Sequence, residues 1–356
     1  MADHCRIDPH AEAILEEYRA QRPVFEKMQE TIPGRVRALL DEAGIVVASI
    51  ESRIKEEGSL AGKLELKGTK YASLADITDI FGMRIITFYT DDVDKVASAV
   101  DRLFEVDWEN SVDKRKLLEV DSFGYLSLHY ICKDPEFPYR FEVQMRTILQ
   151  HAWANMNHDT GYKTGVEVPI EYLRNMNRLA GMLELVDEQF SRIRTEINDY
   201  RRRVQSLVAS GRLEEVPLDG DSYRSFLQLE PFMQLNRRIA SVNQAEIQEV
   251  TLMPFLAVFK AMGFKTLGDV ADLIRDYADA AYQIACYQIG LTDLDILASS
   301  VGPQNLCLAY LLKNGSGRAG IRLMLDTLNV PSESNDMMAE FILAQADDFT
   351  FMHSKD

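Results

Sequence analysis

The chain has 356 residues, with 39 Lys or Arg against 56 Asp or Glu and a formal net charge of −17 at pH 7. This length suggests about two domains. The acidity argues against broad, sequence-independent binding to nucleic acid, which depends on excess positive charge. Four scattered cysteines form no CxxC pair, so no zinc or redox centre is expected. Without an apolar run of ~20 residues or the apolar core of a signal peptide, we expect a cytoplasmic protein that does not bind membranes.

The first part of the chain predicts helices. Within the N-terminal segment 1–50, apolar residues recur every three or four positions from residue 10 onward, and Pro33-Gly34 predicts a break in this pattern. Residues 51–67 continue it as a helix or turn that carries many basic groups. We therefore expect the helical segment 1–50 to be followed by a basic segment over residues 51–67.

A region with strands follows. The β-branched run 83–89 predicts a buried strand, and the acidic turn that starts at Asp91 predicts an amphipathic helix up to Phe104. Two further strands are predicted at 127–133 and 139–146, where apolar and polar residues alternate. The predicted secondary structure therefore changes here from helices alone to strands and helices.

The remainder predicts helices again. One is expected over residues 147–157, and a long amphipathic helix over 170–207. Residues 209–222 are rich in Gly, Pro, Ser and acids and predict a linker. Residues 223–356 predict an all-α domain, within which Thr266-Leu-Gly-Asp269 is typical of a capping box.

Basic groups recur with a spacing of four. Lys55, Ser59, Lys63 and Lys67 would share one stripe of a helix, with Arg53 just before them. Because neighbouring ammonium groups repel one another, a polyphosphate is a natural partner, and an arginine can stack on a base or bridge phosphates. A solvated basic face interleaved with glutamates explains the same pattern, so both interpretations stay open.

Two carboxylates flank the predicted strands. Asp79 precedes the strand 83–89, and Glu142 stands in the middle of a strand whose other face is apolar. Carboxylates from adjacent strands can hold Mg²⁺, which also takes oxygens from substrate phosphates. A salt-bridged polar sheet face is the alternative.

Other polar groups gather near the second predicted strand. Tyr125, Ser127 and His129 would share one face, and a tyrosine beside a glycine offers a surface on which a base stacks. The alternative is a core aromatic residue, and His158 could equally cap a helix. HExxH, GxSxG and GxxxxGK[ST] motifs are absent, which excludes zincin, α/β-hydrolase and P-loop enzymes.

Taken in order, six segments resemble the synthetase domain of the RelA/SpoT family of alarmone synthetases, the GTP pyrophosphokinases. They are RIKEEGS with the following Lys63, DIFGMR from Asp79, DKR from Asp113, FGYLSLH from Phe123, FEVQMRT from Phe141, and the HD and YK pairs between His158 and Lys163. The resemblance implies a synthetase domain over residues 51–208. It further implies an α+β fold in which helices flank a nucleotidyltransferase-like mixed sheet, while residues 223–356 resemble nothing that we can name.

The resemblance implies transfer of pyrophosphate from ATP to the 3′-hydroxyl of GDP or GTP, with release of AMP. It assigns ATP to Arg53, Lys55, Ser59, Lys63 and Arg84, with the two arginines on the adenine. It assigns the acceptor nucleotide to Lys114, Arg115, Tyr125, His129, Gln144 and His158. The catalytic residues Asp79 and Glu142 would hold Mg²⁺, and Glu142 could also accept the proton of the 3′-hydroxyl.

The acceptor motifs depart from the family pattern. Leu126 stands where an arginine is usual, Leu66 replaces another arginine, and Asn157 replaces an acid. Two alternatives therefore stay open: a toxin-type relative that modifies the tRNA 3′-CCA end or an adenosine nucleotide, and a nucleotide-sensing module without catalysis. The first 165 residues are acidic overall, which does not favour tRNA. No hydrolase motif precedes the synthetase motifs, and a homo-oligomer is an open expectation.

Overall fold

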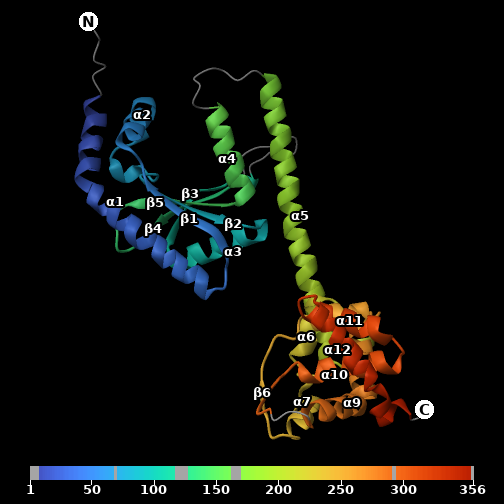
Figure 1. Ribbon diagram of the computed structural model, residues 1–356. Coiled ribbons are helices and arrows are strands. Elements are labelled where there is room, and N and C mark those ends of the chain that lie inside the picture. The colour runs from blue at the N-terminus through green and yellow to red at the C-terminus, as the bar shows by residue number, and fades with distance from the viewer. Residues whose placement is uncertain (1–7, 68–69, 117–126, 162–169, 291–293, 354–356) are drawn as a thin grey trace. The chain divides into compact units, whose positions relative to one another are not determined.

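A computed structural model describes residues 8–67, 70–116, 127–161, 170–290 and 294–353 (Figure 1). The chain divides into two compact units, one up to Thr195 and one from Glu196. Among the described residues, no helix combines the length and the apolar character needed to cross a bilayer.

A five-stranded mixed sheet forms the centre of the first unit. In chain order its strands are β1 (Val47–Ile54), β2 (Phe81–Thr87), β3 (Glu105–Asp113), β4 (Leu128–Lys133) and β5 (Arg140–Thr147). Their spatial order is β1-β2-β5-β4-β3, with β2 parallel to β5 and the other neighbours antiparallel. The mixed sheet expected from the sequence motifs is confirmed.

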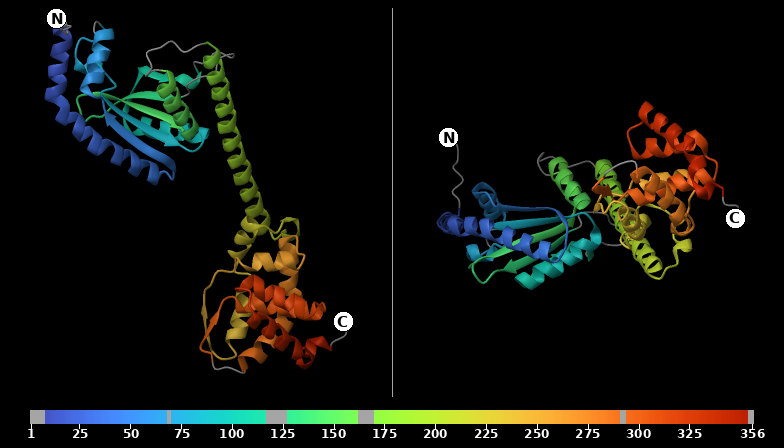
Figure 2. Two further views of the ribbon diagram at one scale, coloured as in Figure 1. Left: turned by 45° about the horizontal axis from the view of Figure 1, so that its top comes forward. Right: turned by 60° about the horizontal axis from the view of Figure 1, so that its bottom comes forward.

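Helices lie on both sides of this sheet (Figure 2). The helical elements are α1 (Pro9–Glu42), α2 (Glu57–Lys67), η2 (Leu74–Asp76), α3 (Thr90–Leu103), η3 (Lys114–Lys116), α4 (Ile148–Gly161) and α5 (Ile170–Ala209). Helices α1 and α3 pack on one face, where alternate residues of β2 and β5 such as Met83 and Val143 form the core. The opposite face of the same strands keeps its polar side chains.

Three predicted features of this unit were wrong. Helix α1 runs through Pro33 without a break, and the helix expected up to residue 50 gives way to strand β1. Arg53 therefore lies on a strand, and Lys55 lies between β1 and α2, so Lys55 does not belong to the helical stripe of Ser59, Lys63 and Lys67. Strand β3 was missed altogether. Both β1 and β3 are edge strands, whose single neighbour permits polar residues on both faces and weakens the alternation.

The second unit is mostly helical, as expected. It contains η4 (Leu213–Glu215), α6 (Gly220–Leu227), α7 (Met233–Ala240), α8 (Phe255–Ala261), α9 (Leu267–Gly290), α10 (Val301–Lys313), α11 (Gly317–Leu328), α12 (Glu333–Ala344), η5 (Ala346–Asp348) and η6 (Thr350–Met352). A short parallel pair, β6 (Glu246–Gln248) with β7 (Ile296–Ala298), was not expected. The predicted capping box is present, because Thr266 N–H donates to Asp269 and Asp269 N–H donates to the Thr266 hydroxyl.

Residues 209–222, predicted as a linker, pack closely on the second unit. Val216 and Leu218 are buried in its core, and backbone hydrogen bonds join them to the segment before α9. Two isolated apolar residues among Gly, Pro and acids carry no periodic signal, which is why composition alone pointed to a linker.

Candidate active site

Strand register brings the predicted site residues together on the polar face of the sheet. Residues directly opposite each other on neighbouring strands present their side chains to the same face. One row across β1, β2 and β5 consists of Arg53, Gly82 and Glu142. The adjacent row across β1, β2, β5 and β4 consists of Glu51, Arg84, Gln144 and His129. The residues that the resemblance assigns to ATP and to the acceptor thus lie on two adjacent rows, and Arg84 shares its row with Gln144 and His129.

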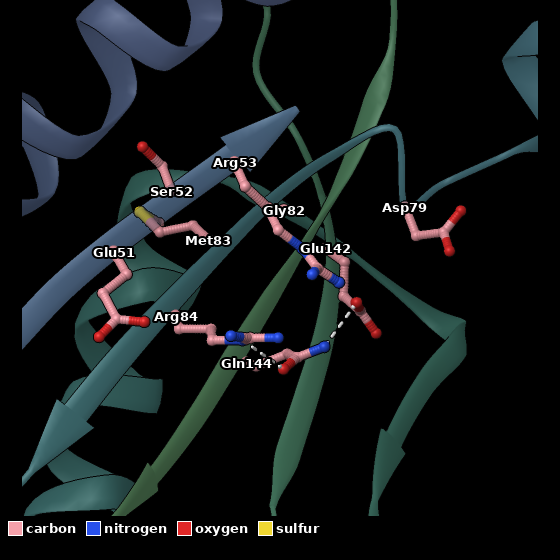
Figure 3. A pocket seen from close by; sticks show the side chains of 9 residues that line it. All are labelled: Glu51, Ser52, Arg53, Asp79, Gly82, Met83, Arg84, Glu142 and Gln144. Atoms are coloured by element: carbon pink, nitrogen blue, oxygen red, sulfur yellow. Dashed lines mark hydrogen bonds between the residues drawn. The ribbon is translucent and has the colours of Figure 1, made fainter. Parts of the chain in front are cut away.

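These rows form the floor of a pocket (Figure 3). The lining residues come from β1, β2, β5 and the turn before β2, and they are Glu51, Ser52, Arg53, Asp79, Gly82, Met83, Arg84, Glu142 and Gln144. Gly82 lies between Arg53 and Glu142, and a Cβ placed on it would meet no atom within 4 Å. The missing side chain leaves open space in the middle of the floor.

Asp79 is held by two ammonium groups. It lies in the turn before β2, where Lys55 Nζ donates to its Oδ2 at 2.8 Å and Lys63 Nζ donates to its Oδ1 at 2.7 Å. Burial alone would raise the pKa of Asp79, but the two lysines outweigh it and hold that pKa below its usual value. The carboxylate is therefore ionised at neutral pH.

Lys63 is the counterpart of this ion pair. Burial favours the neutral amine, yet the hydrogen bond and the charge of Asp79 raise the pKa of Lys63 above its usual value. The ammonium group also lies 5.2 Å from the centre of the Tyr71 ring, within the range of a cation–π contact. Asp79 and Lys63 thus stabilise each other's charged forms.

Glu142 is held by a different kind of partner. His129 Nδ1 lies 2.7 Å from its Oε1, and Gln144 Nε2 donates to its Oε2 at 2.8 Å. Burial would raise the pKa of Glu142, but the contact with His129 and the Gln144 hydrogen bond lower it below the usual value. Gln144 is in turn oriented by Arg84 Nε, which donates to its Oε1 at 3.3 Å (Figure 3).

Within the ranges that the structure describes, the remaining predicted residues are not among those that line this pocket. Ser59 is exposed on α2 and, in the described part of the chain, does not line the pocket. Arg115 donates to Asp113 and Asp94, and these bonds raise its pKa. Its neighbour Lys114 begins η3. Tyr125 lies outside the described residues, as does the side chain of His158, whose backbone belongs to α4.

Two neighbours of the site were missed as functional candidates. Glu51 shares a row with Arg84, and only the strand assignment of β1 could have placed it there. The Ser127 hydroxyl lies 2.5 Å from Nε2 of His129. The alternation that puts Ser127 and His129 on one face was a signal for this contact, because residues two apart on a strand are neighbours.

Comparison with known proteins gives a consistent result. Residues 52–167 match the family model described as the region found in RelA / SpoT proteins. GTP pyrophosphokinase YjbM of Bacillus subtilis (strain 168) is 27% identical over 157 residues, which cover 42% of this chain and 73% of the relative. GTP pyrophosphokinase YwaC of the same strain is 23% identical over 207 residues, covering 52% and 94% respectively.

A solved structure, that of small alarmone synthetase 2 from Bacillus subtilis, aligns at 24% identity with a TM-score of 0.45, covering 51% of this chain and 99% of its own. The sequence matches confirm the resemblance that the six motifs indicated. Through residues 52–167, the chain is therefore similar to the region found in RelA / SpoT proteins.

Proposed function

We propose that this protein is a (p)ppGpp synthetase that transfers pyrophosphate from ATP to the 3′-hydroxyl of GDP or GTP and releases AMP. The RelA/SpoT region and the names of the two GTP pyrophosphokinases support this assignment. The observation that carries it furthest is the pocket in which Asp79 and Glu142, both with lowered pKa values, accompany Arg53 and Arg84.

The donor side suits a polyphosphate. Lys55 and Lys63 hold the carboxylate of Asp79 from two directions, so both ammonium groups are already gathered beside the pocket. An ATP triphosphate would offer them further anionic oxygens, and the planar guanidinium groups of Arg53 and Arg84 suit stacking on a base. Positioning and charge neutralisation are what this type of transfer needs most.

The carboxylate pair also fits Mg²⁺. Asp79 and Glu142 are ionised, line one pocket and present hard oxygen donors, and two carboxylates with substrate phosphates are a usual magnesium environment. In the described residues no group of three or more His, Cys, Asp or Glu could hold a metal ion, so the substrate would have to complete the site. A bound Mg²⁺ would neutralise phosphate charge.

The proposed transfer forms one bond and breaks one bond at the β-phosphorus of ATP, and a carboxylate of this pocket can accept the proton that is released. The 3′-oxygen of the acceptor forms a bond to the β-phosphorus of ATP, the bond from that phosphorus to the α–β bridging oxygen breaks, and AMP leaves with that oxygen. Glu142 would take the hydroxyl proton, since it is an ionised carboxylate. Gln144 and His129 would keep this carboxylate oriented during the reaction.

One acceptor screen tests the proposal. The full chain is incubated with Mg²⁺, ATP labelled in its γ-phosphate, and separately GDP, GTP, ATP, ADP or tRNA. We expect AMP and a labelled guanosine product with GDP or GTP, and no product from the Asp79→Asn variant. Label appearing only in tRNA or adenosine nucleotides would replace the acceptor assignment. Nucleotide binding without any turnover would overturn the transferase assignment.

A further inference from the structure

The hydrogen-bond chain through Glu142 extends beyond the pocket. Arg84 contacts Gln144, Gln144 contacts Glu142, Glu142 contacts His129, and the chain reaches Ser127 behind the histidine. The chain crosses β2, β5 and β4 in sheet order. Ser127 is fully buried, at 0% exposure, and therefore cannot touch a substrate in the pocket.

The two nitrogens of the His129 ring have different partners. Nδ1 lies 2.7 Å from Oε1 of Glu142, and Nε2 lies 2.5 Å from the Ser127 hydroxyl. A hydroxyl can donate or accept, so Ser127 can pair with Nε2 whichever ring nitrogen carries the proton. The serine thereby holds the ring with Nδ1 toward Glu142.

The serine is itself anchored. Its backbone carbonyl accepts a hydrogen bond of 3.0 Å from the N–H of Lys114, which ties the start of β4 to η3. The Ser127 hydroxyl therefore sits at a fixed point of the backbone, while Glu142 at the other end of the contact faces the pocket. Without this anchor the imidazole could rotate and move Nδ1 away from the carboxylate.

We propose that Ser127 is a positioning residue, which fixes the orientation of the His129 ring and, through that ring, the carboxylate of Glu142. This inference rests on the proposed function, because Glu142 matters only if the pocket performs the transfer. Partners behind the primary ligands of such sites typically change activity by about 10–100-fold when they are removed.

The kinetic test compares the full-length wild type with Ser127→Ala, His129→Ala and the double variant. We expect Ser127→Ala to lower kcat about tenfold with the KM for ATP unchanged, and to add little in the His129→Ala background, because the serine acts only through the histidine. Full activity of Ser127→Ala would overturn the proposal. So would a finding that Ser127→Ala lowers kcat by the same factor in the His129→Ala background as in the wild type. If Ser127→Ala does not fold, Ser127→Cys keeps the size with a weaker donor and should lose part of the activity.

Ser111→Ala is the matched control. The Ser111 hydroxyl also contacts β4, accepting from Ile131 N–H at 2.9 Å and donating to the Asp107 carbonyl, but it does not contact the chain through Glu142. Its loss should leave kcat unchanged. A comparable loss in Ser111→Ala would mean that any weakening of β4 impairs the enzyme and would count against a specific role of Ser127.

A spectroscopic readout separates this proposal from the proposed function. In protein labelled with ¹⁵N-histidine, the Nε2 resonance of His129, assigned through its absence in His129→Ala, should shift and broaden in Ser127→Ala, because the ring loses a hydrogen bond and becomes more mobile. It should stay unchanged in Ser111→Ala. An unchanged Nε2 resonance in Ser127→Ala would overturn the positioning role even if the enzyme is active. A wild type that lacks transferase activity but shows the expected change would contradict only the proposed function.

Discussion

The two carboxylates of the pocket are held in opposite ways. At the turn before β2, Asp79 is neutralised by the full charges of Lys55 and Lys63. On the sheet floor, Glu142 is oriented by an imidazole and an amide that lie on the same rigid strands. Lysine side chains are long and can move to a phosphate, whereas strand-borne partners stay in place. If the proposed function holds, we expect the Asp79 end to exchange partners when phosphate binds and the Glu142 end to keep them.

Removing the charge of Glu142 is expected to have the largest effect. Glu142→Gln keeps the size of the side chain but removes the proton acceptor, so kcat should fall by about 10²–10⁴-fold. Asp79→Asn should also abolish measurable turnover, because the lysines lose their counter-charge. Product formation under saturating substrates checks both. If activity survives in Glu142→Gln but not in Asp79→Asn, turnover requires the carboxylate of Asp79 and does not require that of Glu142.

The next largest effect is expected from a substitution that fills the floor of the pocket. Gly82→Val places a β-branched side chain, which suits a strand, in open space between Arg53 and Glu142. We expect nucleotide affinity to fall at least tenfold while the melting temperature stays within about 2 °C of the wild type, as measured by calorimetry and thermal unfolding. Gly34→Val, in α1 and also facing open space, is the control. Undiminished nucleotide binding by Gly82→Val would place the substrates elsewhere.

The lysines offer a finer test of the exchange of partners. Lys63→Met removes one of the two charges on Asp79, so the pKa of Asp79 should rise toward its usual value. The KM for ATP should rise about tenfold, because a hydrogen bond to a charged group is worth about 1.5–3 kcal/mol. Steady-state kinetics with varied ATP measure this. A loss of kcat alone would show that Lys63 orients Asp79 without contacting phosphate.

A third carboxylate, that of Asp187, contributes to stability with a pH dependence opposite to that of Asp79 and Glu142. Asp187 on α5 is buried and accepts a hydrogen bond from the Thr147 hydroxyl; burial raises the pKa of Asp187. Asp79 and Glu142, with lowered pKa values, contribute stability above their unfolded-state pKa values, and it is lost as the pH falls through the folded ones. Asp187 has the opposite sign: its contribution is present below the unfolded-state pKa and is lost as the pH rises through the folded pKa.

Asp187→Asn should therefore raise the melting temperature at pH 7 by a few degrees, about 3 °C, and change it little near pH 3.5, where the native aspartate is protonated. Thermal unfolding at the two pH values measures the difference. Destabilisation at both pH values would mean that Asp187 is ionised and paired in the folded protein.

Much of the first unit could be predicted from its sequence because its central strands are buried on one face. In β5, apolar and polar residues alternate from Arg140 to Met145, and burial follows that alternation until Arg146 and Thr147, which are buried as well. The edge strand β1 gave no such signal. The continuity of α1 through Pro33 could not be foreseen either, because a helix supported by tertiary packing tolerates a proline that local propensity forbids.

Several of the predicted site residues lie together in the structure, but their contacts were not predicted, and their roles stay a prediction. Asp79, Glu142, Arg53 and Arg84 do line one pocket. That both lysines hold Asp79 while His129 holds Glu142 depends on which strands are neighbours, and spacing along the chain cannot show this. The acceptor side depended more on the family resemblance, and Tyr125 stays a prediction because it lies outside the described residues.

The prolines of α1 have a geometric consequence. Prolines 23 and 33 each remove a backbone donor, and such positions allow a helix to curve. Buried residues occur along nearly its whole length, from Ala11 to Leu40, and the helix bends as it follows the sheet (Figure 1). A straight rod touches a twisted surface over only part of its length. Pro23 and Pro33, which would normally end a helix, thus let α1 curve and stay in contact with the sheet that carries the pocket.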